Sequence, residues 1–244
     1  MRIVGYSERG AVNALLYEIF YSQSPERLLE ELLALAHFPL QTHSAVRLNE
    51  ATILVEQSLS DFGDADAILL LHTDDGPMTV FLEAKVKPAQ TVAWRIDEEY
   101  QRFIDGTASQ VSSSNLFTQL YHKVRFVSGL KSGGTAELQR GLPFHKSSTR
   151  PVRRIGHNEV VLRAVAQIKP FLQHVRYFAL VPDEPERVAS FFATMLTAAG
   201  PSGYEGWDAS DYGFMCWVEV EEFCRRQGLV NTLRVLEFNK GQIY

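Results

Sequence analysis

Apolar residues recur at helical spacing in the first forty positions of the chain. From Ser7 to Phe20 they form one stripe, which predicts a helix with a single buried face. Ser24 and Pro25 then supply a cap-type residue and a first-turn proline ahead of a leucine-rich stripe that stops at Pro39. The chain is therefore expected to begin with two helices.

Shorter apolar runs separated by turn residues follow. Residues 52–59 and 65–73 each predict a strand, and residues 78–86 predict a third. Asp74, Asp75, Gly76 and Pro77 form a turn signal between the last two runs, which should therefore pair as an antiparallel hairpin.

The remaining chain alternates between helical and extended patterns. We expect helices at 93–104 and 115–127, an exposed, mobile connection at 131–156, a helix capped by Asn158, a strand at 175–181 and a helix at 183–199. This order predicts an α/β fold with a mixed central sheet flanked by helices. We assign residues 1–200 to one core with a basic insertion at about 128–157, and 201–244 to a C-terminal extension packed on that core.

Composition narrows the class of protein. The 244 residues are 45% hydrophobic and 22% charged, which excludes a disordered chain. Cys216 and Cys224 cannot build a disulfide framework and lack the spacing of a zinc knuckle. No leader-like or membrane-spanning apolar run is found, so we expect a cytoplasmic protein without a membrane partner. The aromatic residues at 204–217 are expected to be core rather than a stacking platform.

Charge is distributed unevenly along a chain whose net charge is -5. Residues 122–176 hold eleven Lys and Arg against two Asp and Glu, a balance of +9. Clustered cations are typical of nucleic-acid backbone binding, and salt bridges to acidic neighbours are the alternative. The candidate contacts to nucleic acid are Lys123, Arg140, Lys146, Arg150, Arg153 and Arg154.

Three charged residues interrupt the apolar strands of the predicted hairpin. A turn centred between Asp74 and Asp75 places Asp66 opposite Glu83, and the period of two places Lys85 on the same face. Two carboxylates and an ammonium at one strand end suit Mg²⁺ or Mn²⁺ and the activation of a water molecule. A purely structural ion pair is the alternative.

Glu8 lies on the apolar side of the first predicted helix. On a helical wheel its position falls within the buried stripe of that helix. We expect it either to support the helix N-terminus or to join the charged residues of the hairpin as a fourth polar member.

Together these residues resemble the PD-(D/E)XK nuclease superfamily, whose fold is restriction-endonuclease-like, mainly over residues 7–126. The two matching elements are Gly63-Asp64-Ala65-Asp66, in place of the Pro-Asp element, and Glu83-Ala84-Lys85. The resemblance implies that Asp66, Glu83 and the carbonyl of Ala84 bind the metal and that Lys85 orients the water. It also implies that Glu8 is the glutamate of the first helix and that Gln119 and Lys123 are polar site residues on a later helix. Asp64 is a second acid in the first element, and the register favours Asp66.

The expected function is hydrolysis of phosphodiester bonds in DNA by a nuclease that depends on Mg²⁺ or Mn²⁺. One alternative is a catalytically silent subunit with this fold that binds DNA or assembles a larger complex; another is a protein unrelated to nucleic acid. A homodimer or a partner subunit is compatible with the sequence. Zinc enzymes are disfavoured because the histidines lack paired spacing, and Walker, Rossmann and nucleophile-elbow motifs are absent from the sequence.

Overall fold

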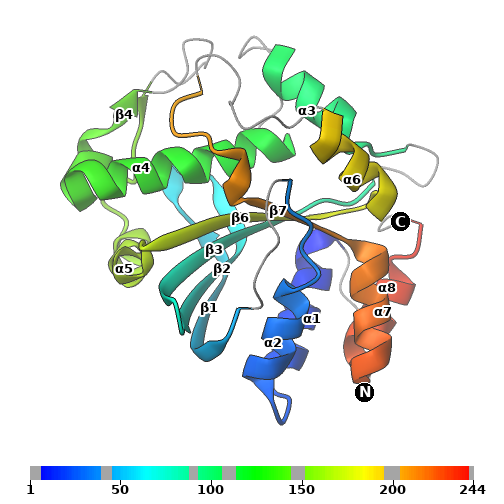
Figure 1. Cartoon of the computed structure of the whole chain (residues 1–244). Coiled ribbons are helices and arrows are strands. Elements are labelled where there is room, and N and C mark those ends of the chain that lie inside the picture. The colour runs from blue at the N-terminus through cyan, green and yellow to red at the C-terminus, as the bar shows by residue number, and fades with distance from the viewer. Residues whose placement is uncertain are drawn as a thin grey trace.

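A mixed β-sheet lies between two layers of helices (Figure 1). The computed structural model describes residues 7–39, 46–87, 93–105, 114–143, 152–194 and 204–241. Within this part of the chain the architecture is α/β, as the alternation of patterns predicts. No helix among these residues is long and apolar enough to span a bilayer.

Five strands of the described chain form the central sheet in the order β1-β2-β3-β6-β7. Their bounds are β1 Leu48–Ser58, β2 Asp64–Thr73, β3 Gly76–Ala84, β6 His174–Val181 and β7 Tyr212–Cys216. Strand β2 is antiparallel to both β1 and β3, whereas β3, β6 and β7 run parallel to one another. The predicted hairpin is confirmed as β2 and β3.

The helices cover both faces of this sheet (Figure 1). One face carries α1 Glu8–Phe20, α2 Pro25–Leu33, α7 Trp217–Gln227 and α8 Val230–Phe238. The other carries α3 Ile96–Asp105, α4 Leu116–Arg140, α5 Glu159–Ile168 and α6 Pro185–Thr194. The first two predicted helices are confirmed, although α2 ends before Pro39, and Asn158 caps α5 by accepting from the N–H of Val160 at 2.9 Å.

Alternation along β2 divides the apolar core into two parts. Ile68 and Leu70 pack toward α4, whereas Leu69 and Leu71 pack toward α1, and each of them is at most 2% exposed. Burial on both faces explains why this strand reads as an almost unbroken apolar run. A charged residue in such a strand needs a partner inside the protein, because burying an uncompensated charge costs several kcal/mol.

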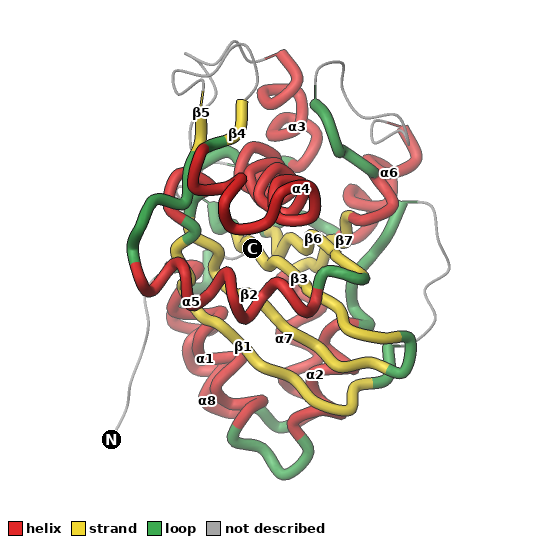
Figure 2. Tube along the Cα trace, turned by 90° about the vertical axis from the view of Figure 1, so that its left-hand side faces the viewer, coloured by secondary structure: helices red, strands yellow, loops and turns green. Residues whose placement is uncertain are grey.

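The predicted connection at 131–156 is wrong in its first part. Helix α4 continues to Arg140 and bends at Gly134, where φ is 66°. Beyond it, β4 Leu142–Pro143 and β5 Val152–Arg153 pair in an antiparallel ladder beside α4 (Figure 2). The Gly and Ser residues that suggested a loop are accommodated by this bend, since glycine adopts positive φ readily.

The C-terminal region contributes more than an extension packed on the core. Strand β7 is hydrogen-bonded to β6, so this region completes the central sheet. Tyr212, Phe214 and Trp217 are fully buried and Trp207 is 8% exposed, which confirms that these aromatic residues are core. A division of the chain at about residue 200 would therefore separate strands of one sheet.

A histidine–glutamate contact fastens the segment after α2 to the end of β7. The backbone groups of His37 and Phe214 exchange hydrogen bonds at 2.8 and 2.9 Å, and His37 Nε2 lies 2.7 Å from Glu219 Oε1. Glu219 also accepts from the N–H of Cys216 at the start of α7. The hydrogen bond to Glu219 raises the pKa of His37, whereas the pKa of Glu219 is lowered because the hydrogen bonds from His37 and Cys216 outweigh its burial.

We expect His37→Gln to remove a pH-dependent part of the folding stability. A histidine whose folded-state pKa lies above 6.5 stabilises the protein fully below that pH, and the contribution is lost as pH rises through the folded pKa. The effect should be at most about 1 kcal/mol, because the side chain is 35% exposed and solvent screens the pair. Urea unfolding of wild type and variant between pH 5.5 and 8.5 measures it, with exposed His157→Gln as control. A wild-type advantage that does not shrink toward high pH would contradict the prediction.

Candidate active site

The hairpin register brings Asp66 and Glu83 together at one end of the sheet. Ala67 pairs with Leu82, as the turn position predicts, so the next opposed positions are Asp66 and Glu83. Asp66 Oδ2 accepts a hydrogen bond of 2.8 Å from the N–H of Ala84. Asp66 is 6% exposed and Glu83 is 1% exposed. Two carboxylates thus share a nearly dry site at the end of β2 and β3.

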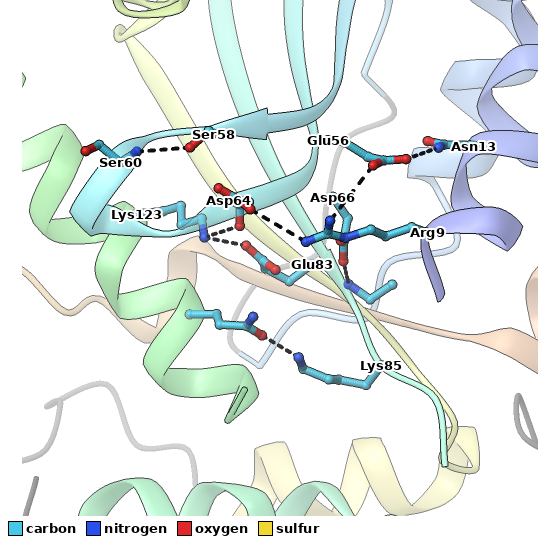
Figure 3. A network of polar contacts seen from close by, with 12 residues as sticks. Arg9, Asn13, Glu56, Ser58, Ser60, Asp64, Asp66, Glu83, Lys85 and Lys123 are labelled. Carbon is cyan, nitrogen blue, oxygen red and sulfur yellow. Dashed lines mark hydrogen bonds and ion pairs between the residues drawn. The ribbon is translucent and has the colours of Figure 1, made fainter. Parts of the chain in front are cut away.

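Glu83 is neutralised by a lysine from α4 (Figure 3). Lys123 Nζ lies 2.6 Å from Glu83 Oε1 and donates to the carbonyl of Asp64 at 2.8 Å. Burial raises the pKa of the Glu83 carboxyl, Lys123 counteracts that rise, and the Asp66 carboxylate adds to it. Its place in the basic segment suggested that Lys123 contacts nucleic acid. That prediction is wrong, because the Lys123 side chain is fully buried.

Lys85 and Gln119 meet on the same side of the sheet as Glu83 and Lys123. Lys85 Nζ donates to Gln119 Oε1, and Gln119 lies one helical turn before Lys123 on α4. The predicted face for Lys85 is confirmed, because Phe81 and Glu83 of β3 also point toward α4. Asp66, Glu83, Lys85 and Gln119 therefore gather at one place.

The backbone of Lys85 is held from two sides beyond the end of β3. Its N–H donates to the carbonyl of Leu180 at 2.8 Å, and its carbonyl accepts from Trp217 Nε1 at 2.8 Å. Trp217 is fully buried at the start of α7, 132 residues farther along the chain. Nothing in the sequence pattern signals this contact, because it depends on how α7 packs against the sheet.

Two residues at the site were not expected from the sequence. Glu56 of β1 stands opposite Asp66, since Val55 pairs with Ala67 and Gln57 with Ala65. The five-residue connection centred on Asp61 could have predicted this register, by the same reasoning that places Glu83. Arg9 of α1 reaches toward the carboxylates of Glu56 and Asp66 (Figure 3). No spacing rule in the sequence identifies Arg9 as a site residue.

Glu8 lies in the first turn of α1, as the first alternative for it requires, and does not join the carboxylates of the hairpin. It is partly exposed and makes no hydrogen bond or ion pair with any other residue that the structure describes. Arg9, the next residue in the first turn of α1, points to the carboxylates instead. At the start of a helix the direction of a side chain depends on the approach of the preceding chain, which a helical wheel leaves out.

The segment between β1 and β2 links the site to the β4–β5 pair. Gly63 has a φ of 80°, a conformation that favours glycine, and a Cβ there would lie 3.4 Å from Lys123 Nζ. Asp61 accepts through Oδ2 from the N–H of Arg154 at 3.1 Å, and its carbonyl accepts from the Arg153 side chain. Both arginines are thereby held by Asp61, which lies three residues before the start of β2.

The basic segment is partly neutralised by acidic residues from elsewhere in the fold. Besides Lys123, Arg125 pairs with Glu205 at 2.9 Å, and Arg176 pairs with Asp211. The alternative of salt bridges to acidic neighbours thus holds for these cations. Among the predicted nucleic-acid contacts, Arg140 and Arg154 are exposed, and Arg140 pairs with Glu137. The predicted contacts Lys146 and Arg150 lie outside the described residues.

The donor set at the site suits a small divalent cation. The described residues contain no group of three or more His, Cys, Asp or Glu side chains that could hold a metal. Mg²⁺ nevertheless is commonly bound by one or two carboxylates, with water and substrate oxygens completing its shell. Asp66 and Glu83 supply that pair, so the residues fit Mg²⁺ or Mn²⁺. Ligation by the carbonyl of Ala84 stays a prediction.

Comparisons of this chain with protein-family models, with curated proteins and with solved structures gave no match. The resemblance to PD-(D/E)XK nucleases therefore depends on the residues themselves, and the α/β class is what the structure establishes.

We expect Lys123→Met to destabilise the protein at pH 7 by about 3–5 kcal/mol, because it leaves the Glu83 carboxylate buried without its cation. Glu83→Gln should also destabilise it, by leaving Lys123 uncompensated. The double variant Glu83→Gln/Lys123→Met should recover most of the loss, since neither charge remains. Urea unfolding of the four proteins measures the coupling, and purely additive losses would contradict the assignment of this ion pair.

Proposed function

We propose that this protein is a divalent-metal-dependent nuclease that hydrolyses phosphodiester bonds in DNA. The observation that carries the proposal is the meeting of Asp66, Glu83 and Lys85 with Gln119 at the end of the β2–β3 hairpin. Two buried carboxylates beside a partly exposed lysine and glutamine would be costly to keep without a use, because a buried charge needs compensation.

Each residue has a distinct role in this proposal. Asp66 and Glu83 would hold Mg²⁺ or Mn²⁺, which when bound polarises a phosphate and lowers the pKa of a water molecule. Gln119 holds the Lys85 ammonium on the Glu83 face, where it can orient the attacking water. Trp217 and Leu180 hold the Lys85 backbone by one hydrogen bond each and so limit its movement.

The basic residues near the site supply a surface for the DNA backbone. Arg153 and Arg154 are held beside the start of β2 by Asp61, so their charges lie close to the chain that enters the site. Neutralising phosphates releases counterions, which makes such contacts strongly salt-dependent. Lys146 and Arg150 are proposed as further contacts on the basis of the sequence alone.

A catalytically silent subunit with this architecture is the second candidate. It is favoured by one observation, namely that Glu83 and Asp66 already face the protein cations Lys123 and Arg9. In that case the charges are structural and bind no metal. Titration of Mg²⁺ and Mn²⁺ into wild type and Asp66→Asn, followed by calorimetry, separates the two candidates: metal binding that the variant loses supports the nuclease, and no binding supports the silent subunit.

We expect Lys85→Ala to lower DNA cleavage by at least about 100-fold while metal and DNA affinity stay near wild type, because a water-orienting group acts in the chemical step. Cleavage of mixed plasmid and single-stranded DNA with Mg²⁺ and Mn²⁺ measures the effect. Lys87→Ala is the matched control. Lys87 follows β3 two residues after Lys85 and makes no contact with the site residues that the structure describes. Joint loss of cleavage and DNA binding in Lys85→Ala would count against the role.

Arg154→Gln should reduce the slope of log binding constant against log salt concentration by about one, because one phosphate contact is lost. Arg154 is exposed and its backbone is fixed by Asp61, so the fold should be unaffected. Filter binding of DNA between 50 and 300 mM salt, with metal omitted, measures the slope. Arg226→Gln, on α7 at the opposite face of the sheet, serves as control, and an equal change there would refute the assignment.

A further inference from the structure

Arg9 lies over the carboxylates of the candidate site (Figure 3). Its Nε is 3.5 Å from Asp66 Oδ1, and its two terminal nitrogens are 3.7 Å from Asp64 Oδ2 and 3.9 Å from Glu56 Oε2. The guanidinium thus faces three acids from two strands. Its side chain is 47% exposed, so it covers the site from the solvent side.

The acids at this end of the sheet need cations for an electrostatic reason. Besides Asp64, the three residues Glu56, Asp66 and Glu83 stand opposite one another on β1, β2 and β3, and like charges in opposed positions destabilise a sheet. Lys123 neutralises Glu83 from the α4 side. Arg9 supplies the second positive charge, on the side where Asp66 remains without a buried cation.

The two compensating cations are held very differently. Lys123 is fully buried and 2.6 Å from its partner, so it is a permanent part of the core. The Arg9 contacts are all 3.5 Å or longer, beyond good hydrogen-bond distance, and they are open to water. Exposed pairs of this kind are individually weak. Arg9 can therefore leave the carboxylates without unfolding its surroundings.

We propose that Arg9 is an exchangeable counter-ion that takes the place of the divalent cation and competes with it for Asp66. The proposal rests on the function proposed above. In the metal-free protein Arg9 offsets the repulsion among the acids. When a divalent cation binds at Asp66, the guanidinium moves off the carboxylates toward solvent, because two cations cannot share that position without strong repulsion.

The test is calorimetric titration of Mn²⁺, without DNA, into wild type, Arg9→Gln, Arg9→Lys and Arg102→Gln. Arg9→Gln should bind Mn²⁺ roughly three- to tenfold more tightly, since no protein cation has to be displaced. Arg9→Lys, which keeps the charge, should stay within about threefold of wild type. Arg102 is the matched control because it pairs with two carboxylates, Glu98 and Glu99, on α3. Its variant should bind Mn²⁺ as wild type does.

The outcomes separate this inference from the proposed function. If wild type binds Mn²⁺, Asp66→Asn abolishes binding, and Arg9→Gln binds equally or more weakly than wild type, only the role of Arg9 is overturned. If neither wild type nor Arg9→Gln binds Mn²⁺, the metal site and the role of Arg9 both fall. A thermal melt of each variant shows whether it is folded. A merely structural Arg9 would lower the melting temperature without tightening Mn²⁺ binding.

Discussion

The buried ion pair between Glu83 and Lys123 connects the centre of the sheet to α4, and the other polar contacts of the site are arranged around it. Lys123 also donates a hydrogen bond to the carbonyl of Asp64, the first residue of β2. The same helix carries Gln119, which holds Lys85. A shift of α4 along the sheet would therefore break the compensation of Glu83 and move Lys85 together, so stability and site geometry depend on one contact.

The site combines permanent and exchangeable compensation of negative charge. Glu83 keeps its lysine inside the core, whereas Asp66 has a half-exposed arginine in front of it and the N–H of Ala84 behind it. The proposed exchange of this arginine for a divalent cation would therefore leave the buried Glu83–Lys123 pair in place. Distant parts of the chain give the arrangement rigidity, since Trp217 of α7 holds the strand end from the side opposite α4.

Local patterns in the sequence determined much of the fold. The first helix, the cap at Asn158 and the two-residue turn after β2 are each decided within a few residues, so periodicity and turn chemistry predict them. The register of Asp66 and Glu83 follows from that turn, because placing the turn of an antiparallel hairpin fixes which residues of its two strands are opposed. The α/β class and the meeting of Lys85 with Glu83 on one face were predictable for the same reason.

The tertiary structure alone decided which charges are buried, paired or exposed. Lys123 reads as one cation of a basic segment, yet the packing of α4 on the sheet buries it against Glu83. Arg9 and Trp217 reach the site from helices far away in the sequence, and β7 joins the sheet although its residues read as an extension. Local propensity carries no information about such contacts, because their free energy depends on several elements packing together at once and on the water that this packing excludes.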